Sequence, residues 1–141
     1  MNHEAWTMDN NQKKIKSFTD LNAWKEGHKL VLMIYETTKK FPKEEIFGLT
    51  IQLRRCSVSI TSNLAEGFSR QSYKEKSYFY SMALGSVTEL QNQILIARDI
   101  HYINQDEFQP MAEQSIIVNK LINGLNKKTK TMIHNSWFMI Q

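Results

Sequence analysis

Apolar residues recur at spacings of three and four along most of the chain, a pattern that predicts amphipathic helices. The clearest series comprises Leu49, Leu53, Cys56, Ile60, Asn63 and Gly67. Series of this kind predict helices over residues 17–40, 45–66, 72–102 and 104–126. Strand-like alternation is essentially absent, and the connections between the helices are short. The sequence therefore predicts an all-α fold, an antiparallel up-down-up-down four-helix bundle.

Local sequences give the expected ends of these helices. Residues 72–75 (Ser-Tyr-Lys-Glu) and 104–107 (Asn-Gln-Asp-Glu) have the form of capping boxes, which start helices. Gly67 is expected to end the second helix, because glycine adopts a left-handed cap without strain. The fourth helix is expected to end near Asn126. Gly85 inside the third helix costs about 1 kcal/mol relative to alanine, which a closely passing backbone would explain.

The second predicted helix carries polar residues that specify how it packs. Asn63 interrupts the apolar series, and we interpret it as a buried, hydrogen-bonded amide that sets helix register. Together with Gln52, Glu66 and Gly67 it forms a structural signature. Cys56 is the only cysteine of the chain and lies on the apolar series, so we expect a core thiol and a reducing, cytoplasmic setting.

The chain divides into three parts. Residues 1–16 have no sustained period and are expected to form a flexible N-terminal arm, followed by the bundle over residues 17–126. Residues 127–141 are first basic and then apolar, and Ile133, Trp137 and Ile140 would share one face of a helix. Either this segment docks on the bundle or a neighbouring subunit, or it is a motif that binds a protein partner.

The net charge of +4 lies outside the predicted bundle. Residues 18–126 contain 12 Lys plus Arg and 12 Asp plus Glu, so the excess belongs to the two ends of the chain. A contact with a polyanion therefore has to use those ends or a locally sorted face of the bundle. The longest apolar run, at residues 30–35, is too short to cross a bilayer, and the N-terminus does not resemble a signal peptide.

The sequence contains no pattern typical of a catalytic, cofactor or metal site. Glu-x-x-His and His-x-x-x-His pairs, paired cysteines and a glycine-rich phosphate loop are all missing. We therefore expect no enzyme activity, no cofactor and no metal, although a site assembled between subunits remains an alternative. Arg54 and Arg55 have two interpretations: they pair with carboxylates of neighbouring helices, or they project onto an anion-binding surface.

Several spaced motifs resemble those of one known family. They are Phe18-x-x-Leu21-x-x-Trp24-Lys25, Phe41-Pro42-x-x-Glu45-x-x-Gly48-Leu49, Gln52-Leu53-Arg54-Arg55, Ser59-Ile60-x-x-Asn63-Leu64-Ala65-Glu66-Gly67 and Gly85-Ser86-x-x-Glu89-Leu90. Their order and spacing resemble the four-helix-bundle family named for proteins encoded in 23S ribosomal RNA intervening sequences. The resemblance covers about residues 18–126.

The resemblance implies a ring-like homo-oligomer, commonly a pentamer, without known catalytic activity. That family is similar to the accessory variability protein of diversity-generating retroelements, a basic pentameric barrel that binds nucleic acid and a reverse transcriptase. We therefore expect an oligomeric, non-enzymatic protein that binds RNA or DNA through phosphate contacts. The candidate contacts are Lys127, Lys128 and Lys130, with Arg54 or Arg55. The alternative is a scaffold that presents its C-terminal segment or bundle surface to a protein partner.

Overall fold

The computed structural model describes the backbone of residues 14–140 and the side chains of residues 14–136. This part of the chain contains no β-strand. Its helices are η1 (Phe18–Asp20), α1 (Asn22–Thr38), η2 (Lys43–Glu45), α2 (Leu49–Ser69), α3 (Tyr73–Asp99) and α4 (Gln105–Ile140), where η denotes a short 3-10 turn. The expected all-α fold is therefore confirmed.

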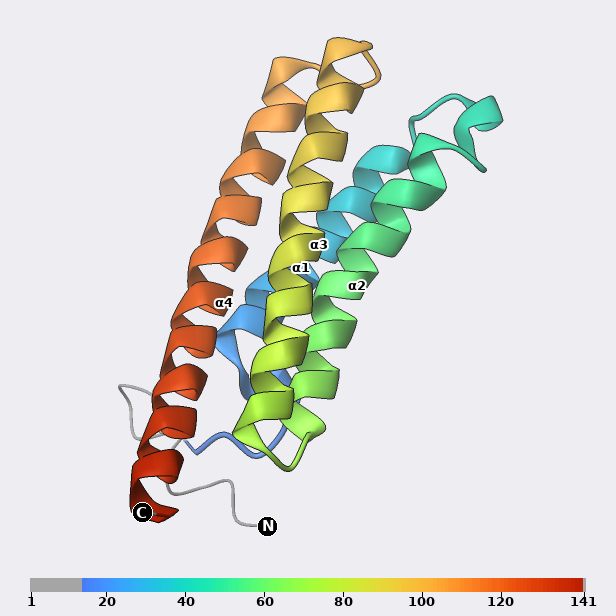
Figure 1. Cartoon of the computed structure of the whole chain (residues 1–141). Coiled ribbons are helices and arrows are strands. Elements are labelled where there is room, and N and C mark those ends of the chain that lie inside the picture. The colour runs from blue at the N-terminus through green and yellow to red at the C-terminus, as the bar shows by residue number, and fades with distance from the viewer. Residues whose placement is uncertain (1–13, 141) are drawn as a thin grey trace.

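The four long helices run alternately up and down and form one bundle (Figure 1). Each helix packs against the preceding one, and α4 also packs against α1, which closes the bundle. Helices α2 and α4 are diagonal and do not contact each other. Figure 1 defines an upper end, with the α1–α2 and α3–α4 connections, and a lower end, where α2 is joined to α3. In this arrangement α3 lies between α2 and α4.

The predicted apolar series form the core of the bundle. Leu53, Cys56 and Ile60 of α2 are all buried, as the spacing of the second helix requires. They contact one continuous cluster to which every long helix contributes, including Leu30, Ile34, Leu64, Tyr80, Val87, Leu90, Ile94, Val118 and Ile122. The amphipathic pattern therefore identified the buried faces of α2, α3 and α4. On α1 the buried face is centred instead on Ala23, Gly27, Leu30 and Ile34, and His28 and Tyr35, which share the expected face, are exposed.

The two predicted capping boxes start α3 and α4. The Ser72 hydroxyl accepts a hydrogen bond from the backbone N–H of Glu75 at 3.1 Å. At the start of α4 the bonding is reciprocal: Asn104 Oδ1 accepts from Glu107 N at 2.8 Å, and Glu107 Oε1 accepts from Asn104 N at 3.1 Å. The expected start at Ser17 is only partly correct, because Ser17 caps η1 and α1 begins after Leu21.

The expectation that Gly67 ends α2 is wrong. Helix α2 continues through Ser69, and no glycine in the described residues has a positive φ. Gly67 is buried instead against α3, where an added β-carbon would lie 2.7 Å from Cε1 of Tyr80. The glycine therefore permits the close approach of two helices.

The role expected for Gly85 is also wrong, because no atom lies within 4 Å of the position that its β-carbon would take. The left-handed residue of the described chain is His101, with a φ of 68°. It ends α3 at the upper end, where Tyr102 N donates to the carbonyl of Ala97 at 2.9 Å. An exposed histidine thus supplies the backbone conformation that we expected of a glycine elsewhere.

Helix α4 does not end near Asn126 but continues to Ile140. Asn126 is buried against α3, where its Oδ1 accepts from the Ser77 hydroxyl at 2.8 Å. Thr129, one turn further on, is also buried. The lysines at 127, 128 and 130 are therefore part of a continuous helix. Residues 1–13 of the flexible arm that was expected over residues 1–16, and the apolar side chains after Ser136, lie outside what the structure describes.

Candidate nucleic-acid interface

Charged residues are sorted along α4. The three carboxylates of this helix, Asp106, Glu107 and Glu113, lie in residues 105–113. Residues 114–140, which we call the lysine half, carry no carboxylate and four exposed lysines: Lys120, Lys127, Lys128 and Lys130. A locally basic surface therefore lies on a bundle whose overall charge is balanced.

Among the residues that the structure describes, these four lysines have no partner of opposite charge. No salt bridge joins any of them to a carboxylate in the described part of the chain. The helix dipole does not account for them either, because its effect is confined to the last turn and Lys130 lies well before Ile140. Their ammonium groups are therefore available to an external anion.

The side of the lysine half that faces α3 forms a shallow hollow of about 540 Å³. Its floor includes Asn126, whose amide nitrogen donates to the Ser81 hydroxyl at 3.0 Å and is thereby held against α3. The hollow is lined by Asn123, Asn126, Lys127, Lys130, Thr131 and His134. Ammonium and amide donors are thus gathered on one open surface, where phosphate oxygens can accept hydrogen bonds from them.

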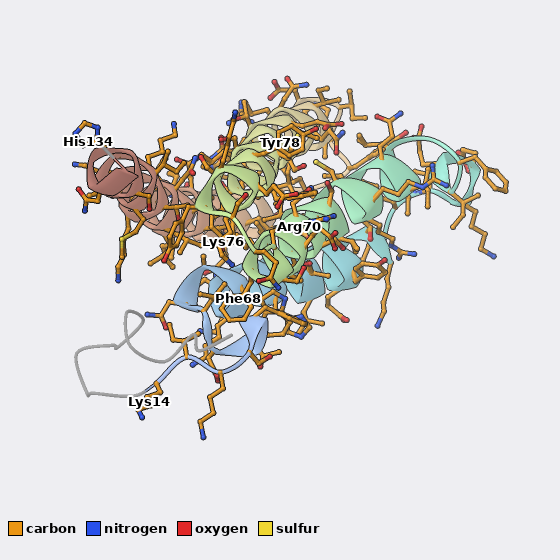
Figure 2. The ribbon with its side chains drawn as sticks, turned by 60° about the horizontal axis from the view of Figure 1, so that its bottom comes forward. Lys14, Phe68, Arg70, Lys76, Tyr78 and His134 are labelled. Carbon is orange, nitrogen blue, oxygen red and sulfur yellow. The ribbon has the colours of Figure 1, made fainter. Side chains whose placement is uncertain are left out.

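Lys120 and Lys128 line a second hollow on the other side of α4, beside Leu21 at the start of α1. The lysine half therefore presents cations in two directions. Figure 2 looks at the lower end and shows His134 at the tip of α4, well apart from Arg70 and Lys76 where α2 meets α3. The basic surface consequently lies along the lysine half of α4.

The structure separates the candidate arginines from these lysines. Arg54 Nε donates to the Thr38 hydroxyl at 2.9 Å, and its guanidinium lies 4.8 Å from the ring centroid of Tyr35. Arg54 therefore joins α2 to α1. Arg55 is exposed, but it lies on α2, diagonal to α4. Within a single copy of the protein, therefore, neither arginine belongs to the surface that carries Lys127, Lys128 and Lys130.

The signature residues of α2 occupy different environments. Asn63 is half-buried and bonds within its own helix, donating to the Ser59 carbonyl at 2.9 Å, so it is not the fully buried register residue that we expected. The Ser59 hydroxyl is the group that reaches α3, at 2.9 Å from the Ser86 hydroxyl. Gln52 and Glu66 are exposed, and Glu66 forms an ion pair with Arg70.

Cys56 is a packing residue. Its Sγ lies 3.0 Å from the carbonyl oxygen of Ser86, to which the thiol donates. Burial, with a smaller contribution from the nearby carboxylate of Glu89, raises the pKa of Cys56 to about 12. The thiol is therefore protonated at neutral pH and is a poor nucleophile.

Sequence reasoning missed the most deeply buried cation, Lys76 on α3. Its side chain is 2% exposed, and Nζ donates to the Phe68 carbonyl at 2.6 Å, with the Gly67 carbonyl at 3.4 Å. Burial lowers the pKa of Lys76. The ammonium thus caps the last carbonyls of α2. Its position in the sequence could have indicated this burial, because Lys76 lies one turn before Tyr80 on the apolar series of α3.

Within the described residues, no group of three or more His, Cys, Asp and Glu side chains is arranged to hold a metal ion. None of the helices in residues 14–140 is long and apolar enough to cross a bilayer.

Comparisons with known proteins identify the family. The chain is similar over 74% of its length to a structure described as a protein of unknown function from the S23 ribosomal protein family of Bacteroides thetaiotaomicron. The match covers 95% of that chain, with a TM-score of 0.69 and 19% identity, and shows the shared fold. No curated protein matches. The profile of the family described as 23S rRNA-intervening sequence protein matches residues 19–124, and the chain belongs to this family.

Proposed function

We propose that this protein binds nucleic acid through phosphate contacts made by the lysine half of α4. The observation that carries the proposal is that residues 114–140 contain four exposed lysines and no carboxylate, and that none of these lysines forms a salt bridge within the described part of the chain. A carboxylate among them would repel phosphates and pair with the lysines in their place. A polyanion that binds here gains from released counterions, which are the main source of sequence-independent affinity.

The chemistry of the surface favours binding of the backbone over reading of bases. The hollow beside α3 offers the Asn123 amide as a further hydrogen-bond donor near Lys127 and Lys130, whereas the Thr131 hydroxyl already donates to the Lys127 carbonyl at 3.1 Å. Such donors fix the position of a phosphate chain without selecting a sequence. The donors that the hollow offers to a ligand are ammonium and amide groups. RNA and DNA are both accommodated by this chemistry.

Self-association is the second candidate function, because α3 bears apolar side chains on its outer surface as well as in the core. Tyr78, Met82 and Ile96 are 61%, 48% and 42% exposed on the outer surface of α3. A helix that is apolar around most of its circumference is typical of one that is covered on both sides. A second copy of the chain is the cover we propose, in keeping with the ring-like oligomers that the family resemblance implies.

The nucleic-acid proposal is tested with a triple variant, K127A/K128A/K130A. Three lost phosphate contacts should weaken binding of mixed-sequence RNA about 10- to 100-fold at about 50 mM salt, and should reduce the slope of log affinity against log salt by roughly 3. Fluorescence anisotropy at several salt concentrations measures both quantities. The rival scaffold function predicts instead that deletion of residues 128–141 removes a captured protein and leaves RNA binding unchanged.

The matched control is K29A/K39A/K43A, which removes the same charge from α1 and η2. Lys29 and Lys39 already pair with Glu26 and Glu36 at 2.8 and 3.0 Å. We expect the control to change affinity less than about 3-fold, since screening reduces charge effects beyond about 10 Å. Equal losses in both triple variants, or binding that ignores salt, would exclude the lysine half as the site.

A further inference from the structure

The connection between α1 and α2 presents an aromatic ring to solvent. Phe47 is 92% exposed, more than any other large apolar residue of the described chain, and the preceding Ile46 is 49% exposed. In Figure 1 this connection is the loop at the upper right, which projects away from α4. We call residues 42–48 the Phe47 loop. An isolated exposed apolar residue is common, but two adjacent ones at the tip of a loop form a small anchor.

Internal hydrogen bonds fix the Phe47 loop in place. The Glu45 carboxylate accepts from the backbone N–H of Leu49 at 2.9 Å and from the Tyr102 hydroxyl at 3.2 Å, which ties the loop to α2 and to the end of α3. Gly48 N donates to the Glu45 carbonyl at 2.9 Å and closes the turn directly after Phe47. Because the loop is already ordered, burying the ring against a partner would cost little conformational entropy.

The charges around the ring favour a protein partner over a polyanion. Lys43 and Glu44 flank the loop with opposite signs, and Glu45 adds a second carboxylate. A phosphate backbone would be repelled by these carboxylates, so stacking of a nucleic-acid base on Phe47 is disfavoured. An aromatic side chain presented by an ordered loop is typical of an anchor that fills a pocket on another protein.

The same chain carries a matching groove on the opposite side of the bundle. Between α1 and α4, a groove of about 550 Å³ is lined by Leu32, Met33, Pro110 and Met111. Leu32 is 56% exposed there, and methionine side chains adapt readily to an inserted ring. We call this the α1–α4 groove. It lies on the side of α1 away from α2, so the Phe47 loop of the same chain does not fill it.

We infer that Phe47 of one copy inserts into the α1–α4 groove of a second copy; this rests on the proposed self-association. The charges are compatible, because each surface carries one lysine and two carboxylates: Lys43 with Glu44 and Glu45 near the ring, and Lys40 with Glu36 and Glu107 around the groove. The lysine of each surface can therefore approach the carboxylates of the other. Neither surface carries charge of a single sign that would repel another copy. The ring and the groove face different sides of one molecule, so the contact is heterologous and runs head to tail.

A head-to-tail contact gives every copy one donor side and one acceptor side. Both features lie at the upper end of the bundle (Figure 1), so neighbouring copies can stand side by side with parallel axes. Such a contact produces a ring when the rotation between copies closes. It also makes two different variants complementary, because one can lose its ring while the other loses its groove.

The test uses F47D and L32D, which place a carboxylate on the ring side and on the groove side of the contact. Each variant alone is expected to be monomeric by sedimentation velocity at concentrations where the unaltered chain is oligomeric. Mixed in equal amounts, the two should form a 1:1 pair and nothing larger, because one intact ring meets one intact groove. V58D is the control, since Val58 is 37% exposed on α2, outside the Phe47 loop, the α1–α4 groove and the exposed surface of α3, and should leave the assembly unchanged.

Each other outcome counts against a defined part of the inference. An unaltered chain that is monomeric would overturn both the self-association and the role of Phe47. An oligomer that persists in F47D would leave self-association standing and exclude the ring as its anchor. Two monomeric variants that fail to pair when mixed would exclude the head-to-tail contact. Matching thermal unfolding midpoints of all variants would show that the exposed substitutions leave the bundle folded.

Discussion

Charged side chains at opposite ends of the bundle serve opposite kinds of backbone group. At the upper end, carboxylates bond to backbone N–H groups at helix starts: Glu45 serves α2 and Glu107 serves α4. At the lower end, the buried ammonium of Lys76 serves the carbonyls that end α2. Each of these charges completes the hydrogen bonding of a helix. The exposed lysines at residues 120–130 of α4 complete none, and this difference distinguishes a structural charge from one available to a ligand.

Among these charged groups, we expect substitution of Lys76 to change the free energy of unfolding most. We expect K76A to lower the free energy of unfolding by about 3 kcal/mol, because it leaves a cavity and uncaps the Phe68 carbonyl in the core. K76M keeps most of the volume and should cost only about 1 kcal/mol. Urea unfolding followed by circular dichroism measures both values. Equal losses in the two variants would assign the whole effect to the hydrogen bond.

A smaller effect is expected at Gly67, where the lower end is most tightly packed. G67A places a methyl group 2.7 Å from the buried ring of Tyr80, so we expect a loss of about 2 kcal/mol. G85A is the matched control within the same pair of helices. Nothing surrounds Gly85, and alanine there should stabilise α3 by about 0.5 to 1 kcal/mol. Changes of the same sign at both positions would contradict the close approach assigned to Gly67.

The smallest effect is expected at the upper end, at Glu107. The Glu107 carboxylate accepts a hydrogen bond from the backbone N–H of Asn104. This bond, with a further contribution from Lys40, holds the pKa of Glu107 below its usual value. A lowered carboxyl pKa adds stability that is present above the unfolded-state pKa and disappears as the pH falls through the folded-state pKa. E107Q should therefore cost about 1 kcal/mol near neutral pH and almost nothing at about pH 3.

The control for Glu107 is E113Q, since Glu113 is an exposed carboxylate of the same helix that accepts a hydrogen bond only from the Gln109 side chain in the described chain. Urea unfolding at both pH values should separate the two variants near neutrality and not in acid. A difference between E107Q and the unaltered chain that persists in acid would show that the carboxylate charge is not the stabilising feature.

Features that depend on local sequence were predictable. The four helices follow from apolar spacing, and the starts of α3 and α4 follow from Ser72 and Asn104, because a cap is completed within one turn. The lysines at 127, 128 and 130 were recognised as a basic run. In each case the physical cause lies within a few residues of the feature.

Features that depend on contacts between helices were not predictable. A glycine that ends a helix and one that admits a neighbouring ring look alike in sequence, so Gly67 was misread until Tyr80 was placed beside it. Lysine is usually exposed, which concealed Lys76. Polar residues after Asn126 suggested that α4 ended there, whereas packing against α3 extends it. For the same reason the contact of Arg54 with Tyr35 could not be anticipated.

Cys56 gives the protein a built-in reporter of motion. It is the only thiol in the chain, 5% exposed and bonded across the interface between α2 and α3. A thiol-specific reagent can reach it only after those two helices separate. The rate of labelling under native conditions therefore measures how often the bundle opens along that interface, without an introduced probe. Labelling with and without bound RNA would show whether a ligand on α4 slows the opening of helices that it does not touch.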